Sequence, residues 1–166
     1  MPTTYDKTPD EVLHLINETM EKYHPDLTNN GVTVDALFAE NSNGDPLKHG
    51  GYPALAYVKI TNLRNRIKGF ADAEITIDRL VWNGLSQEQR ASLIDHELYH
   101  LQVKTDKDGN TKTDDADRPK LGLKKHDYQF GWFREIAARH GQNSMECYQA
   151  NMILKNDGLT FFPNKA

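Results

Sequence analysis

The stretch SQEQRASLIDHELYHLQV, residues 86–103, constrains the fold of this chain more than any other. Ser86 and Gln89 have the spacing of a capping box, in which two side chains satisfy the backbone N–H groups at a helix start. A helix is therefore expected from Ser86 to about Leu101 or Val103. Residues at helical spacing form an apolar stripe that should face the core, namely Ala91, Ile94, Leu98 and Leu101.

Two histidines share a different face of this helix. His96 and His100 lie one turn apart, and Glu97 falls at the edge of their side. Two imidazoles on one helix face can hold a zinc ion, and a glutamate beside the first can reach the water on the metal. We therefore expect His96 and His100 to bind Zn²⁺ and Glu97 to act as the catalytic general base. The alternative is a pair of structural histidines.

A catalytic zinc needs a third protein ligand and one open position. The downstream candidates are His126, Asp127, Glu135 and His140. A helix is expected from about His126 to His140, which would place these two residues roughly 20 Å apart and too far for one metal. On that helix Glu135 projects to solvent, whereas His126 shares an inward stripe with Phe130, Phe133 and Ala137.

His126 is the third ligand that we expect. Residues 101–125 form an excursion long enough to bring the chain back over the metal. The alternative is a buried histidine packed against Phe130.

The rest of the pattern predicts an α+β fold. Thr8, Pro9 and Glu11 suggest a capped N-terminal helix that ends near Tyr23. Three strands are expected at 31–40, 54–61 and 70–78, with turn-rich residues at 41–53 and a hairpin connection or basic loop at NLRNRIKG. Asp108 and Gly109 suggest a hairpin tip, and a last helix should run from after Asn143 to about Lys155. Residues 1–166 should form one domain with an N-terminal helix, a three- or four-stranded mostly antiparallel sheet, and the helix of His96 packed on the helix of His126.

Composition narrows the class of protein. A net charge of −4 with only short basic patches argues against nucleic-acid binding. The single Cys147 excludes an internal disulfide, as is usual in a reducing compartment; we interpret it as a small buried apolar residue. No apolar run of 18 residues and no signal-peptide pattern is present. A cytoplasmic protein without membrane spans is expected.

The segments IDHELYHLQ and KKHDYQFGWF resemble the small zincin-like domains of the SprT type, and more closely the phage metallopeptidase family. The resemblance covers roughly 50–140, with the strand AEITID (73–78) before the HELYH helix. It implies a zincin-like metallopeptidase, with its core at about 50–140, in which the third histidine is His126. The chain departs from the SprT type by having Asp127 where glycine often follows, and by lacking a four-cysteine zinc ribbon, which argues against a DNA-directed role.

The function expected is zinc-dependent hydrolysis of peptide bonds in a protein or peptide, such as a host bacterial protein. The strand 73–78 could pair with the substrate as an edge strand, and Tyr52, Tyr99 or Tyr128 could stabilise the oxyanion. Residues 104–120 form an acidic solvated hairpin or a loop that gates the cleft. The alternative function is a non-catalytic phage effector that uses the same scaffold to bind or inhibit a host protein.

Overall fold

The chain divides into two units, Met1–Lys125 and His126–Ala166. The computed structural model describes residues 2–127 and 131–154. The expectation of one domain over 1–166, with its core at about 50–140, stays a prediction.

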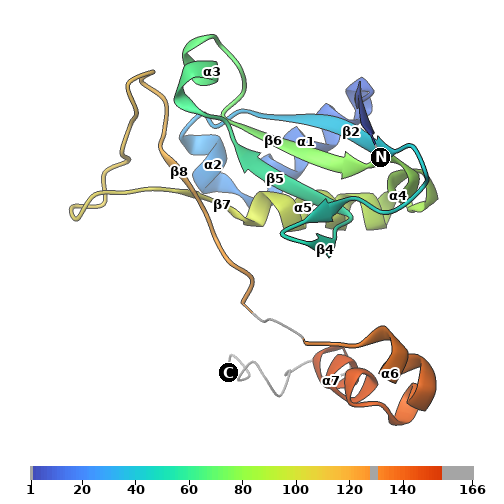
Figure 1. Ribbon diagram of the computed structural model, residues 1–166. Coiled ribbons are helices and arrows are strands. Elements are labelled where there is room, and N and C mark those ends of the chain that lie inside the picture. The colour runs from blue at the N-terminus through green and yellow to red at the C-terminus, as the bar shows by residue number, and fades with distance from the viewer. Residues whose placement is uncertain (1, 128–130, 155–166) are drawn as a thin grey trace. The chain divides into compact units, whose positions relative to one another are not determined.

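A four-stranded sheet forms the centre of the first unit (Figure 1). Its strands, in spatial order, are β1 (Thr3–Lys7), β2 (Val34–Asn41), β6 (Ala73–Asp78) and β5 (Ala56–Ile60). The β1–β2 and β5–β6 pairs are antiparallel and the β2–β6 pair is parallel, so the expected α+β class with a mostly antiparallel sheet is confirmed. The expectation that strand 73–78 lies at an edge is wrong, because β6 is paired on both sides. The edge strand is β5.

Helices α1 (Asp10–Tyr23) and α5 (Gln87–Tyr99) contact each other and pack on the sheet. The short helices α2 (Pro25–Asn29) and α4 (Arg79–Gly84) add to this layer. Among the described residues no helix is long and apolar enough to cross a membrane. The largest fully buried apolar side chains of the core are Ile16, Leu27, Ile75, Ile77, Ile94 and Leu98.

Local sequence signals explain where these two helices begin. The capping box of α5 is confirmed: the hydroxyl of Ser86 accepts from the Gln89 backbone at 3.2 Å, and the Gln89 side chain accepts from the Ser86 backbone at 2.9 Å. The capping box expected at Thr8 is wrong. The hydroxyl of Thr8 instead donates to the carbonyl of Ala36 in β2, so α1 starts at Asp10 without a side-chain cap.

Two other expectations differ from the structure. Helix α5 ends at Tyr99, because the next residues form strand β7 (Leu101–Val103), which pairs with β8 (Leu121–Leu123). The segment NLRNRIKG connects the antiparallel strands β5 and β6, as expected, and it contains helix α3 (Leu63–Ile67), capped by the Asn62 side chain. The expected loop at 41–53 contains a small hairpin, β3 (Lys48–His49) and β4 (Tyr52–Pro53).

A two-lobed loop, residues 104–120, joins β7 to β8. Lobe 1 is KTDKDGNT (104–111) and lobe 2 is KTDDADRP (112–119), an eight-residue repeat that the sequence analysis did not recognise. In each lobe one aspartate, Asp106 or Asp114, accepts through one carboxylate oxygen from the backbone two and four residues later. The turn expected at Asp108-Gly109 is confirmed as the tip of lobe 1, where Gly109 has φ 83°.

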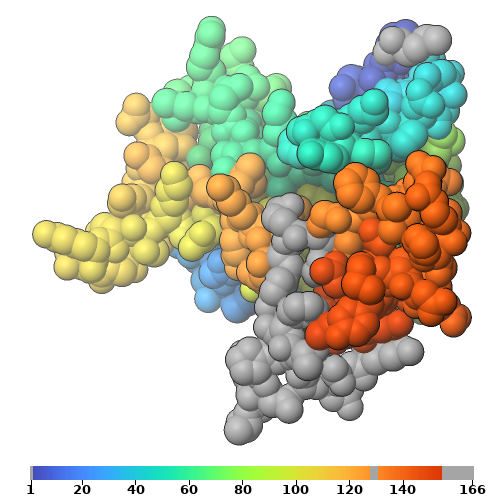
Figure 2. Space-filling view, turned by 60° about the horizontal axis from the view of Figure 1, so that its bottom comes forward, coloured from blue at the N-terminus to red at the C-terminus, as the bar shows by residue number. Residues whose placement is uncertain are grey.

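The backbones of three lysines close this loop at its base. Lys104 donates to the carbonyl of Lys120, Lys112 to that of Lys104, and Lys120 to that of Lys112, at 2.8–2.9 Å. Each lobe therefore begins and ends at this group of three lysines. Lobe 1 projects from the surface (Figure 2), whereas lobe 2 is held against the end of the sheet beside α3.

A buried carboxylate, Asp72, holds lobe 2 in place. It accepts hydrogen bonds from the guanidinium groups of Arg66 and Arg118 and from the backbone and hydroxyl of Thr33. Arg66 also donates to Asp114 of lobe 2 at 2.6 Å. Burial alone would raise the pKa of Asp72, but these hydrogen bonds outweigh it and lower the pKa to about 2.

The second unit contains α6 (Arg134–His140), a 3-10 turn (Gly141–Asn143) and α7 (Met145–Leu154). The expected helix from His126 is wrong at its start: His126 and Asp127 are not helical, and α6 begins only at Arg134. The third ligand candidate is therefore not carried by a helix. Of the expected inward stripe, Phe133 is 71% exposed and Phe130 lies outside the described residues, as does Lys155, the expected end of the last helix.

Candidate metal centre

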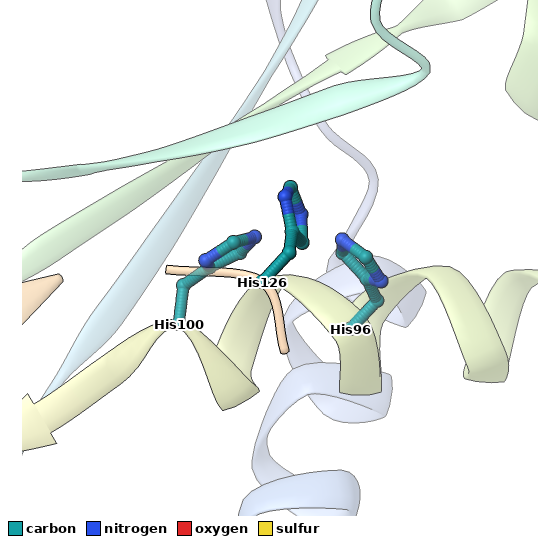
Figure 3. Close-up of side chains that lie close together, drawn as sticks. All are labelled: His96, His100 and His126. Atoms are coloured by element: carbon teal, nitrogen blue, oxygen red, sulfur yellow. The ribbon is translucent and has the colours of Figure 1, made fainter. Parts of the chain in front are cut away.

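Three histidines lie together at the end of α5 (Figure 3). His96 projects from the last turn of the helix, His100 is its C-cap residue, and His126 follows β8 in a segment that is neither helix nor strand. One ring nitrogen of each lies within 4.8 Å of the others. In the described part of the chain this is the one group of three or more His, Cys, Asp or Glu side chains that could hold a metal ion.

The donor set fits zinc. Tetrahedral zinc with Zn–N bonds of about 2.0–2.1 Å separates two nitrogen ligands by about 3.4 Å. The nitrogen atoms here, up to 4.8 Å apart, need to approach by about 1.4 Å at most. Both His96 and His126 are exposed, and small rotations of their side chains supply that movement. Three imidazoles leave a fourth position of a tetrahedral metal for water or substrate.

A backbone contact sets the tautomer of the neutral His100 ring. Nδ1 of its ring lies 2.6 Å from the carbonyl oxygen of Lys124. A carbonyl oxygen only accepts hydrogen bonds, so in the neutral ring Nδ1 carries the hydrogen and Nε2 carries the lone pair. The backbone N–H of Lys124 donates back to the carbonyl of His100 at 2.6 Å. This pair of bonds orients the ring as ligand histidines usually are oriented, and it holds the chain two residues before His126.

Glu97 is buried beside the histidines, with 4% of its surface exposed. Desolvation raises the pKa of its carboxyl group, while His100 and a hydrogen bond with the Val58 backbone oppose the rise. Within the described residues no lysine or arginine forms an ion pair with it. A carboxyl group in such surroundings binds a proton more readily than an exposed one, which suits a general base.

The hydrogen bond with Val58 shows which edge of the sheet Glu97 faces. Leu55 accepts from Asp78 and Thr61 donates to Asp72, so alternate residues from 55 to 61 bond β6. Ala56, Val58 and Ile60 therefore direct their backbone N–H and C=O groups to the other side, the edge of β5 away from β6. The carboxyl group of Glu97 lies at that edge.

The other candidates are placed elsewhere. Glu135 pairs with Arg139 on α6 at 2.9 Å, and Asp127 is exposed; neither belongs to the histidine group, nor does His140. Tyr52 is 77% exposed, and Tyr128 lies outside the described residues. Sequence analysis missed Lys124 and Val58, because both act through backbone atoms that no residue type announces.

Comparison with known proteins identifies a family for the chain. A family model described as "Putative phage metallopeptidase" matches residues 5–155. The match is longer than the stretch of about 50–140 on which the resemblance was first seen, and it runs through both units. No curated protein and no solved structure matches the chain.

Proposed function

The chain belongs to the phage metallopeptidase family, and from this premise we propose that it is a zinc-dependent peptidase with His96, His100 and His126 as ligands. The observation that carries the proposal is the approach of the three ring nitrogens to within 4.8 Å, with the buried Glu97 beside them. Imidazole ligands with one open position are typical of catalytic rather than structural zinc.

Each residue then has a defined task. Zinc, when bound, activates water at about neutral pH and polarises the peptide carbonyl. Glu97 accepts the proton of the attacking water and later passes it to the leaving amine. His100 keeps its orientation through its Nδ1 hydrogen bond to the Lys124 carbonyl. The substrate is a protein or peptide, and the edge of β5, rather than that of β6, is the strand edge beside Glu97 along which its backbone can pair.

Metal content tests the ligand set. Wild-type protein, His126→Ala and the matched control His140→Ala are purified and their zinc measured by mass spectrometry. We expect about one zinc per chain in the wild type and in the control, and much less in His126→Ala. Equal zinc in all three proteins would exclude His126 as a ligand, and no zinc in the wild type after zinc is supplied would overturn the proposal.

Cleavage tests the role of Glu97. Zinc-loaded wild type and Glu97→Gln are incubated with a peptide library made from a bacterial proteome, and new termini are identified by mass spectrometry. The variant should keep its zinc and lose activity by about 10²- to 10⁴-fold. A wild type that binds zinc yet produces no new termini would favour the alternative, a non-catalytic effector.

A further inference from the structure

A series of side-chain contacts connects residues that are close in sequence to the three histidines. It starts at His24, which is buried at the end of α1 and lies 2.6 Å from the carboxylate of Asp95. The ring of His24 meets that of Tyr99 edge-on, with centroids 6.3 Å apart and planes at 62°. The other contact of the Tyr99 ring is the ammonium group of Lys124, 3.6 Å from the ring centroid.

Each member of this series is next to a metal-ligand candidate. Asp95 precedes His96, Tyr99 precedes His100, and Lys124 lies two residues before His126. Two residues of extended chain span at most about 7 Å, so the position of Lys124 limits where His126 can lie. The backbone of Lys124 is already bonded to His100. Its side chain, held over Tyr99, fixes the same segment a second time.

The exposure of Tyr99 shows that its side chain does not contribute to the hydrophobic core. The side chain is 55% exposed and is not part of the buried cluster that stabilises the sheet and its helices. Its contacts with His24 and Lys124 therefore act locally. They connect the helix that carries two of the histidines to the strand end that carries the third.

We propose that Tyr99 and Lys124 are positioning residues that hold His126 at ligand distance from His96 and His100, with the His24–Asp95 pair fixing the ring of Tyr99. The inference rests on the proposed function, because it concerns the affinity of the same site for zinc. Side chains behind metal ligands commonly change metal affinity by about 10- to 100-fold when they are lost.

Zinc affinity of Tyr99→Ala, measured by competition with a chelating dye, is the first test. The variant loses both ring contacts and should bind zinc about 10-fold more weakly or worse. Tyr99→Phe is the matched control: it keeps the ring face over which Lys124 lies, so its affinity should remain within about twofold of wild type. Thermal melting of the metal-free proteins shows whether each variant is folded.

A second pair of variants acts on Lys124 and leaves Tyr99 in place. Lys124→Met removes the cation over the ring and should weaken zinc binding by about 2- to 5-fold, whereas Lys124→Arg should retain wild-type affinity. If Tyr99→Ala fails to fold, the zinc affinities of Lys124→Met and Lys124→Arg test the positioning role instead.

A double-mutant cycle shows whether the effect passes through the third ligand. In a His126→Ala background, Tyr99→Ala should cost less than about threefold in zinc affinity, since the residue that it positions is gone. An undiminished cost there would overturn the inference, as would wild-type affinity in both Tyr99→Ala and Lys124→Met. Absence of zinc binding by the wild type would instead contradict the proposed function and the inference with it.

Discussion

Asp72 and Glu97 are both buried carboxylates, with 1% and 4% of their surface exposed, yet their pKa values move in opposite directions. Burial raises the pKa of each. At Asp72 two guanidinium groups and the Thr33 backbone more than compensate, and the pKa falls to about 2. At Glu97 only His100 and the Val58 backbone oppose the rise, and the pKa stays above its ordinary value.

The difference lies in the partners of the two carboxyl groups. A carboxylate surrounded by arginines is a fixed anion and joins lobe 2 to α3 and the sheet. A buried carboxyl group without a lysine or arginine partner binds a proton more readily than an exposed one, and its charged form costs stability. Burial alone does not distinguish the two roles, but the partners do. Substitutions at these two positions should therefore have opposite effects on stability.

The largest effect on stability is expected for Asp72→Ala. It leaves the buried Arg66 without its main partner, and breaking a buried ion pair in this way typically costs about 3–5 kcal/mol. Urea unfolding measures the loss. The exposed Asp115 of lobe 2 provides a matched control, whose replacement by alanine should change stability by less than about 0.5 kcal/mol. Similar losses in the two variants would contradict the assigned role of Asp72.

Acid should remove part of the stability that ionised Asp72 contributes to the fold. Because the folded-state pKa of Asp72, about 2, lies below the ordinary value of 3.8, its stabilisation is present above pH 3.8 and is lost as the pH falls toward 2. The shift corresponds to about 2 kcal/mol. The difference in unfolding free energy between wild type and Asp72→Asn should shrink by that amount from pH 5 to pH 2. A pH-independent difference would mean that the two states bind this proton equally.

A smaller loss is expected for Arg118→Lys, which keeps the charge but not the fork of two hydrogen bonds to Asp72 at 3.1 and 2.6 Å. Since the Arg118 side chain is 35% exposed, we expect a loss of about 1.5 kcal/mol in urea unfolding. Titration of the Asp72 carboxyl by NMR should show a higher pKa in this variant. Unchanged stability and pKa would indicate that charge alone, without the paired geometry, accounts for the environment of Asp72.

Glu97→Gln should act in the opposite direction in metal-free protein. Replacing a buried carboxylate that lacks a lysine or arginine partner by a neutral side chain of similar shape should raise the unfolding free energy by about 1 kcal/mol. The measurement is urea unfolding at pH 7 in the presence of a chelator. A loss of stability as large as that in Asp72→Ala would remove the distinction between the two carboxylates.

The sequence predicted the helix of the site better than its surroundings. Ser86 with Gln89 and the buried Ile94 and Leu98 are local signals, and they sufficed to place His96 and Glu97. His126 was selected for a reason that proved wrong, a helix start, although the return of the chain over the helix was anticipated. Its position depends on the pairing of β7 with β8 and on backbone bonds of Lys124, which are tertiary features.

Sheet order and buried charge were equally hard to predict. Strands 54–61 and 70–78 were recognised, but which of them lies at the edge depends on the parallel pairing of β2 with β6 across the intervening chain. Arg66 was interpreted as part of a basic loop, because a sequence does not reveal that Asp72 and Asp114 surround it. The metal-binding pattern survives such errors since its two histidines and its glutamate lie within one helical turn.

The lysine ring at the base of the two-lobed loop makes lobe 1 a replaceable module, whereas lobe 2 is tied to Arg66 and Asp72. Lys104, Lys112 and Lys120 follow one another around the ring at eight-residue intervals, so the chain re-enters at the same point after each lobe. We expect residues 105–110 of lobe 1 to be exchangeable for a foreign peptide, such as an epitope tag, because the backbone bonds of the ring are then kept. The protruding lobe thus offers a grafting position for immobilising the protein.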